Sequence, residues 1–195
     1  FFPSLLGGAA YMLSGPVASL VSPGHDGKLY VAALLPLALW MVVRGVRDGP
    51  AWAWGVLALT VGLGVLSPHP QLLQYMLLAA GFFGLYVAFA AHDGVKLERG
   101  LAVMRLALAA VAVGIGFLIG GIQYAPVLEY VDWPPRAGGR DYDYSASFAK
   151  PPAELLGTLL PDFTGVKETY WGTNGIKLHG EYLGAVFLQK FGQTP

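Results

Sequence analysis

The stretch "SPGHDGK", residues 22–28, gathers three side chains that could bind an anion or a cation. Lys28 stands at the start of an apolar run, where it can hold a phosphate as a point charge. Asp26 can orient His25 or bind a divalent cation through its carboxylate oxygens. The alternative is a solvated loop in which the ammonium group of Lys28 only reaches toward water.

A second polar stretch, "SPHPQ" at residues 67–71, interrupts two apolar runs. Pro68 and Pro70 restrict the residue before each of them and predict a tight turn between antiparallel helices. His69 would then lie at the mouth of a helical hairpin, with Gln71 on the first turn of the next helix. A helix N-terminus with polar side chains favours an anionic group. The alternative is a plain turn, in which His69 and Gln71 only cap backbone groups.

Weaker candidates lie in the last third of the chain. Asp141 and Asp143 are paired carboxylates that could bind a cation or act as acid and base. Tyr170 and Trp171 could form a stacking platform for a sugar ring, and His179 could donate a hydrogen bond to it. A solvated loop and a folded loop core are the respective alternatives.

The composition of the chain predicts that these residues are positioned by membrane helices. Hydrophobic residues make up 55% of the 195 residues and charged residues 12%, and the mean hydropathy is +0.54. Soluble proteins carry about 25% charged residues, so the expected partner is a lipid bilayer. The zero net charge gives no reason to expect a nucleic-acid partner. The absence of cysteine excludes disulfides and thiolate metal sites.

The hydropathy pattern predicts an all-α polytopic bundle of about five membrane spans. A span needs about 20 mostly apolar residues. The expected spans are residues 1–21, 29–43, 51–66, 71–91 and 101–123. Arg105 interrupts the last span near its start, and we expect it to reach to the interface. Gly116 and Gly120 form a GxxxG pair that predicts close helix packing.

The basic residues of the loops predict the orientation of the bundle. Residues 44–50 and 91–100 carry two basic residues each, whereas residues 67–71 carry none. The positive-inside rule places the basic loops in the cytoplasm. The loops that contain His25 and His69, and all residues after 123, then lie on the outer side.

Two regions follow from this division. Residues 1–123 form the transmembrane region, and residues 124–195 form an extracytoplasmic loop region with the start of a further span. Prolines, charges and aromatics replace the apolar runs in the second region. The run "PPAELLGTLL" there predicts a short helix that opens after two prolines. We expect the chain to be a fragment of a longer protein.

The chain resembles the YfhO-like family of bacterial multi-pass membrane proteins. The motifs that carry this resemblance are "GGAAYMLSG", "PGHDGKLYVAALLPLAL", "SPHPQLLQYM", "YVDWPPRAGG" and "YWGTNGIKLHGEYLG". This family is similar to the GT-C glycosyltransferases, which transfer a sugar from a polyprenyl-phosphate lipid to an acceptor outside the cytoplasm.

The resemblance implies a function at the outer face of the bacterial plasma membrane. The implied partners are a polyprenyl-phosphate-linked sugar and a cell-envelope acceptor, with a divalent cation as the one cofactor to consider. His25, Lys28, His69 and Gln71 would contact the donor phosphate, with "HPQ" at a family-like position. In this class the general base is usually an acidic residue in the first outer loop. If the chain is a fragment, that loop can be missing from it.

Two other functions use the same residues. In a transporter or lipid flippase, the polar side chains would guard a pathway; a scaffold would have no affinity for lipid phosphate. Ion-coupled transporters often carry ionisable residues within their spans. Here the expected spans contain only Arg105, which weakens the transporter interpretation.

Overall fold

A computed structural model of the chain describes residues 2–21, 24, 26–91, 94–130, 142, 146, 149–160, 163–165 and 167–172. Within these residues the fold is all-helical, with 82% of them in helices and no strands. The chain divides into two compact units, one of residues 27–134 and one of residues 1–26 with 135–195.

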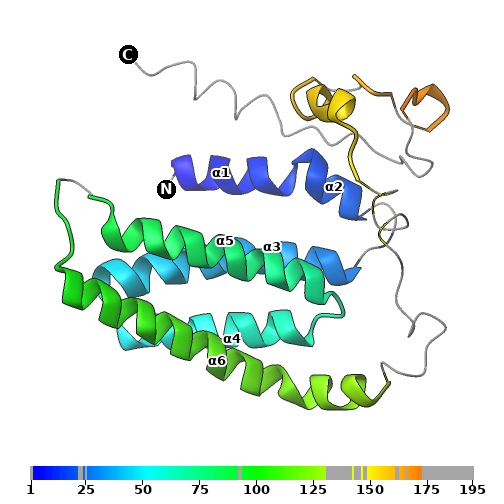
Figure 1. Ribbon diagram of the computed structural model, residues 1–195. Helices are drawn as coiled ribbons and strands as arrows, with labels where there is room; N and C mark the ends of the chain where they lie inside the picture. The colour runs from blue at the N-terminus through cyan, green and yellow to red at the C-terminus, as the bar shows by residue number, and fades with distance from the viewer. Residues whose placement is uncertain are drawn as a thin grey trace. The chain divides into compact units, whose positions relative to one another are not determined.

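Four long helices and a π-helical turn build the unit of residues 27–134 (Figure 1). In chain order they are α3 (Asp26–Val43), the turn η1 (Arg44–Asp48), α4 (Ala51–Leu66), α5 (Pro70–Phe89) and α6 (Arg99–Tyr130). Gly49 ends the η1 turn in the left-handed conformation at φ 76°, which glycine adopts without steric cost. Glu98 precedes α6 and caps its start, because its carboxylate accepts hydrogen bonds from the backbone N–H groups of Gly100 and Leu101.

Three helical segments are long and apolar enough to cross a membrane: Asp26–Asp48, Pro70–Phe89 and Arg99–Tyr130. They correspond to the expected spans at 29–43, 71–91 and 101–123, and the first and last are longer than expected. The helix α4 has the bounds expected for it, and its 16 residues make it a shorter apolar helix. The described residues are therefore compatible with a lipid bilayer, with three candidate spans where the sequence predicts about five.

The expected span at residues 1–21 consists of two short helices. The helix α1 covers Phe2–Met12 and α2 covers Gly15–Val21. Pro16 is the second residue of α2, a position where proline begins a helix because no intrahelical N–H bond is needed there. The proline therefore marks a helix start inside the apolar run and divides it.

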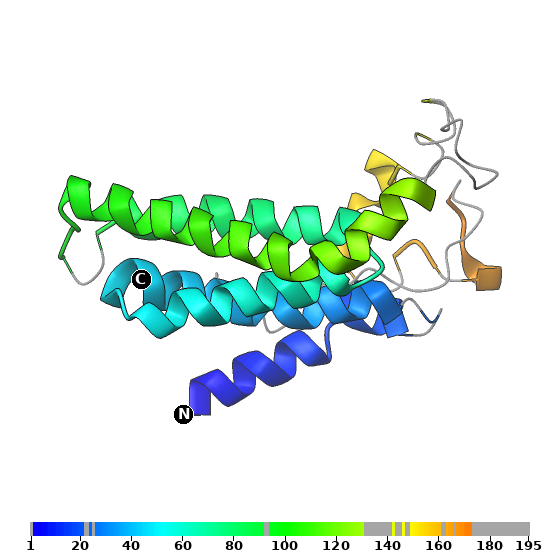
Figure 2. The same ribbon diagram turned by 90° about the horizontal axis from the view of Figure 1, so that it is seen from below.

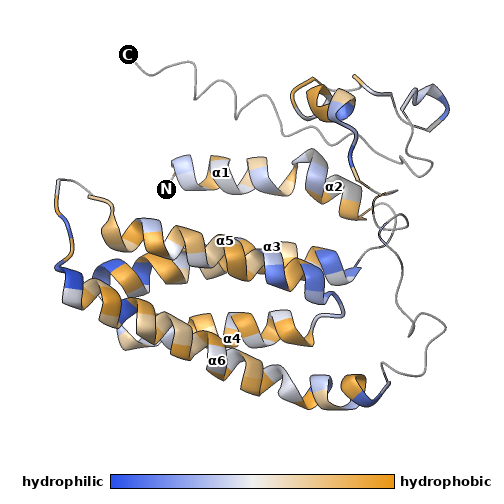
Figure 3. Ribbon diagram, in the orientation of Figure 1, coloured by the Kyte–Doolittle hydropathy of each residue, from blue (hydrophilic) through white to orange (hydrophobic). Residues whose placement is uncertain are grey.

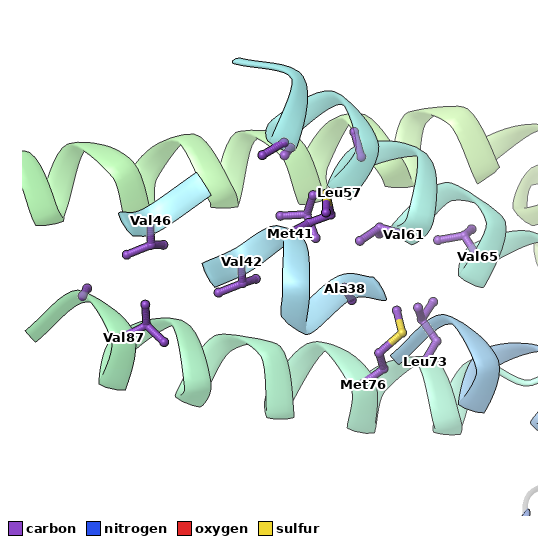
Figure 4. Packing of buried hydrophobic residues seen from close by; sticks show 14 of the residues in the cluster. Ala38, Met41, Val42, Val46, Leu57, Val61, Val65, Leu73, Met76 and Val87 are labelled. Carbon is purple, nitrogen blue, oxygen red and sulfur yellow. The ribbon is translucent and has the colours of Figure 1, made fainter. Parts of the chain in front are cut away.

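The core of the α3–α6 unit is built from aliphatic side chains and methionines. Figure 4 shows Ala38 and Met41 of α3, Val61 and Val65 of α4, and Met76 of α5 within this cluster, all of them nearly inaccessible. Polar residues are rare in it; the hydroxyl of buried Thr60 donates to the carbonyl oxygen of Val56 at 2.7 Å, within its own helix. Few polar groups in the core therefore need a hydrogen-bond partner.

The helices α4 and α6 pack most closely, through glycines on both sides (Figures 1 and 2). A Cβ atom on Gly116 would lie 2.6 Å from Cβ of Val61, and one on Gly62 would lie 2.9 Å from Cγ2 of Ile119. A Cβ atom on Gly120 would overlap the side chain of Val65. The GxxxG pair therefore has the packing role that its spacing predicts.

Two arginines connect the helix ends at one end of this unit. Arg105 of α6 donates from Nη1 to the carbonyl oxygens of Val46 at 2.9 Å and Arg47 at 2.6 Å. Arg47 donates to the carbonyl oxygen of Ala90, just beyond α5, at 2.6 Å. The end of η1, the end of α5 and the start of α6 therefore meet, and both guanidinium groups satisfy carbonyls at helix C-termini.

Hydrophilic residues concentrate near the helix ends of this unit, while the middle of each helix is mostly hydrophobic (Figure 3). One end holds Arg44, Arg47 and Arg99, and the opposite end holds Lys28 and the turn around His69. Such a distribution suits helices whose middle portions contact lipid.

Candidate functional site

The turn between α4 and α5 owes its shape to its two prolines. Ser67, which precedes Pro68, is extended at φ −74° and ψ 137° and ends α4. His69, which precedes Pro70, is also non-helical, at φ −141° and ψ 76°. Pro70 is then the first residue of α5. The predicted tight turn between two helices is present at these residues.

This turn lies against the start of α3. The hydroxyl of Ser67, a nearly buried residue, donates to the carbonyl oxygen of Gly27 at 2.7 Å. A Cβ atom on Gly27 would lie 3.0 Å from Cγ of Pro68, so there is little room for a larger residue. The two polar stretches that the sequence singles out therefore meet, at residues 27 and 67–68.

The imidazole of His69 caps α5. Its Nδ1 accepts the backbone N–H of Leu72 at 3.2 Å, and this bond satisfies one of the N–H groups that a helix start leaves without an intrahelical partner. The capping alternative is therefore correct for His69. A neutral imidazole that accepts at Nδ1 carries its proton on Nε2, which is a hydrogen-bond donor.

Gln71 and Lys28 have different environments. The side-chain amide of Gln71 donates to the hydroxyl of Tyr75 at 2.9 Å, one turn further along α5, and both residues are exposed. Gln71 therefore does not cap the helix. Lys28 is half-exposed on the first turn of α3, and it forms no salt bridge with the residues that the structure describes.

Two helix N-termini lie together at this junction, which we call the Gly27–Ser67 junction and define as residues 27–28 and 67–71. The helices α3 and α5 both begin here, and each N-terminus carries a partial positive charge. Lys28 adds a full positive charge, but Asp26 on the same turn adds a full negative charge, and α4 ends here with the partial negative charge of a helix C-terminus. An anion such as a phosphate would therefore bind by direct contact with the ammonium group of Lys28 and with N–H groups at a helix start, and not through a net positive field.

The metal-binding prediction receives no support from the described residues. Asp26 is the first residue of α3 and is exposed. Within the described part of the chain, no three histidine or acidic residues come together as a metal site would require. His25, Asp141, Asp143 and His179 lie outside the described residues.

Trp171 and Tyr170, the expected stacking pair, belong to the other unit and have separate roles. The hydroxyl of Tyr170 donates to Oε1 of Glu154 at 2.5 Å, and Glu154 is only 1% exposed in the 3-10 helix η2 (Pro152–Thr158). Trp171 is 56% exposed, with its indole N–H donating to the carbonyl oxygen of Phe163 at 2.9 Å. Tyr170 therefore helps hold the segment together, while Trp171 keeps ring surface available for stacking.

The expected short helix after Pro151 is η2, and a second 3-10 helix, η3 (Lys167–Thr169), precedes Tyr170. The rings of Phe163 and Trp171 meet edge to face, with centroids 5.8 Å apart. The backbone N–H of Trp171 also donates to the carbonyl oxygen of Thr164 at 3.2 Å. The indole therefore has a fixed orientation within this segment.

Sequence reasoning did not predict the roles of Ser67 and Gly27. Ser67 connects the two stretches by donating a hydrogen bond to a backbone carbonyl oxygen. Every residue has such a carbonyl group, so the sequence gives no sign of which one accepts the bond. The one available signal is that both polar stretches begin with "SP" and follow apolar runs. That signal places both stretches at helix ends and does not reveal the contact.

Comparison of the chain with protein-family models, with curated proteins and with solved structures finds no match.

Proposed function

We propose that this chain belongs to a membrane glycosyltransferase that moves a sugar from a polyprenyl-phosphate donor to a cell-envelope acceptor. The observation that carries the proposal is the Ser67–Gly27 hydrogen bond, because it brings two helix N-termini and Lys28 to one place. A lipid-linked donor presents its phosphate at the membrane surface, where the ammonium group of Lys28 and the N–H groups of a helix start can contact it.

The proposed frame is a bundle of about five spans in a bacterial plasma membrane. The basic helix ends around Arg44 and Arg47 face the cytoplasm, following the positive-inside rule. The Gly27–Ser67 junction then lies at the outer face, as does the segment that carries Trp171. The resemblance to the YfhO-like family supports this arrangement.

In this reaction an oxygen of the acceptor attacks the anomeric carbon of the sugar. The bond between that carbon and the phosphate oxygen breaks, and polyprenyl phosphate leaves with the electron pair. Lys28 and N–H groups at the start of α3 stabilise the negative charge on the leaving phosphate. The proton of the acceptor hydroxyl passes to a carboxylate, which the resemblance places in the first outer loop.

The role of Arg105 weakens the alternative of ion-coupled transport. Its guanidinium group donates to two carbonyl oxygens at the end of η1 and so has a structural function. A transporter of this kind often uses ionisable residues within its spans. Arg105 is the ionisable residue in the expected spans, and its hydrogen bonds are made to helix ends.

The test is a transfer assay on the full-length protein in liposomes, with a radiolabelled polyprenyl-phosphate sugar and an acceptor. The variant Lys28→Gln with His69→Gln removes the positive charge and the imidazole from the junction. We expect label transfer to fall at least a hundredfold, because the leaving phosphate loses its stabilisation.

Lys96→Gln is the matched control, because it removes an exposed lysine from the connection before α6. We expect it to transfer label like the unmodified protein, and we expect both variants to insert in the membrane. Normal transfer by the double variant would disprove the proposed site. Label that crosses the bilayer still attached to its lipid would favour a flippase.

A further inference from the structure

A cavity of about 530 Å³ lies within the α3–α6 unit. Its walls come from all four helices and from η1, and consist of alanine, valine, leucine, methionine, phenylalanine and glycine alone. Pockets of about 300–1,000 Å³ are the size that binds small ligands. These side chains offer no hydrogen bond, so the cavity suits a hydrocarbon and not a sugar or a phosphate.

The cavity has a buried floor and an exposed mouth. Ala38 and Val42 of α3 and Val61 of α4 form the floor, and all three are nearly inaccessible (Figure 4). Phe82 of α5, which also lines the cavity, is 70% exposed, and Ala110 of α6 is exposed too. The cavity therefore opens between α5 and α6, at the outer surface of the unit.

The surroundings of that mouth are the hydrocarbon of the bilayer if α5 and α6 are spans. Both helices are long and apolar enough for this. The two helices also contact each other, and every residue that lines the cavity between them is apolar. A hydrocarbon chain of the surrounding bilayer therefore matches the chemistry of the opening.

We propose that this cavity binds one acyl chain of a membrane phospholipid, which enters sideways between α5 and α6. Ala38 lies about 16 Å along α3 from Gly27 at 1.5 Å per residue, and the cavity continues from there to Val46. On α5 the lining runs from Met76 to Leu85, so it begins about 9 Å from the first residue of that helix and lies along its middle. The site is therefore separate from the Gly27–Ser67 junction.

Gly81 and Gly114 provide a matched pair of variants. A Cβ atom on either glycine would have no neighbour within 4 Å, so a side chain can be added without displacing the helix. Gly81 lines the cavity, whereas Gly114 does not. Gly81→Phe therefore places a ring at the cavity, and Gly114→Phe adds the same ring elsewhere on the apolar surface.

The experiment uses the full-length protein in vesicles of phosphatidylethanolamine and phosphatidylglycerol. A trace of phospholipid carries a diazirine in the middle of one acyl chain, and adducts are located by mass spectrometry after illumination. We expect adducts within residues 76–85 and 106–113. Gly81→Phe should reduce them at least fivefold, while Gly114→Phe should leave them unchanged.

Equal labelling of these residues in Gly81→Phe and the unmodified protein would overturn the proposal, since it would indicate lipid on the outer surface only. Stronger labelling there by a diazirine-bearing polyprenyl phosphate than by the phospholipid would also overturn it. If Gly81→Phe fails to insert, Ala110→Phe takes its place. In the unmodified protein, a phospholipid with its diazirine in the headgroup should give no adducts at these residues.

Discussion

At the scale of single residues, the cationic side chains of the α3–α6 unit divide into two groups. Arg47 and Arg105 donate to carbonyl oxygens at helix ends, and Arg44 pairs with Asp48 and lies over the ring of Trp52 at 5.9 Å. Their charges are therefore used within the protein. Lys28, Lys96 and Arg99 have no such bond to a described residue. Of these three, Lys28 lies at the Gly27–Ser67 junction and is the cation that we assign to ligand binding.

Replacement of Arg105 tests the structural role of the first group. In Arg105→Ala, the carbonyl oxygens of Val46 and Arg47 lose a charged donor, and hydrogen bonds to charged groups contribute about 1.5–3 kcal/mol. We expect the free energy of unfolding in detergent micelles to fall by that amount. Arg105→Lys should recover part of it, because an ammonium group is a donor without the planar fork of arginine.

Arg99→Ala is the control for this measurement. Arg99 is an exposed residue at the start of α6, where a positive charge opposes the helix dipole. Its replacement should leave the unfolding free energy nearly unchanged. An equal loss in both arginine variants would show that charge, and not the two carbonyl contacts, accounts for the effect of Arg105.

Residue types near the turn predicted its backbone and, as one of two alternatives, the cap formed by His69, but not the contact with α3. Pro68 and Pro70 act through local sterics, so their effect can be predicted from a short stretch of sequence. The Ser67–Gly27 contact joins residues 40 positions apart, and His69 binds a backbone N–H three positions away. The long-range contact depends on how α3 and α4 pack, which is set by the whole unit.

At the scale of helices, hydropathy alone located most of the apolar elements. The bounds of α4 agree with the expected run, and α5 and α6 begin within two residues of theirs. The run at residues 1–21 divides because a proline stands in its middle, an effect that a hydropathy average does not register. The length of α6 was also underestimated, since the helix continues through Pro126 to Tyr130.

The α4–α6 contact gives a prediction for helix packing. Gly116→Val would place a Cβ atom 2.6 Å from Cβ of Val61 and 2.8 Å from the carbonyl oxygen of Ala58. Overpacking of this kind costs about 1–3 kcal/mol, and the two helices must separate to relieve it. We expect the variant to unfold at lower denaturant concentration in micelles.

Gly114→Val serves as its control, two positions earlier on the same helix. A Cβ atom there would have no neighbour within 4 Å, so the change in helix propensity is the same without the clash. If both valine variants unfold alike, helix propensity and not the α4–α6 contact sets the cost.

At the scale of the whole α3–α6 unit, the two ends differ in chemistry. One end joins arginines to helix C-termini, and at the other the Ser67–Gly27 hydrogen bond joins the end of α4 to the start of α3, close to the start of α5. The loop charges predicted this division, because basic residues alternate from loop to loop along the sequence. The sequence could not show that the two polar stretches touch, and the proposed phosphate site depends on that contact.

A disulfide between Gly27→Cys and Pro68→Cys tests this contact most directly. The chain has no cysteine, so any crosslink must come from the introduced pair. A Cβ atom on Gly27 would lie 3.0 Å from Cγ and 3.5 Å from the backbone carbonyl carbon of Pro68, so two cysteines at these positions stand close enough for a disulfide to form. We predict a nearly complete disulfide in native membranes after mild oxidation. The control pair, Gly27→Cys with Gly94→Cys in the connection before α6, should not crosslink. No disulfide at residues 27 and 68 under oxidation would contradict the proposed junction and the phosphate site built on it.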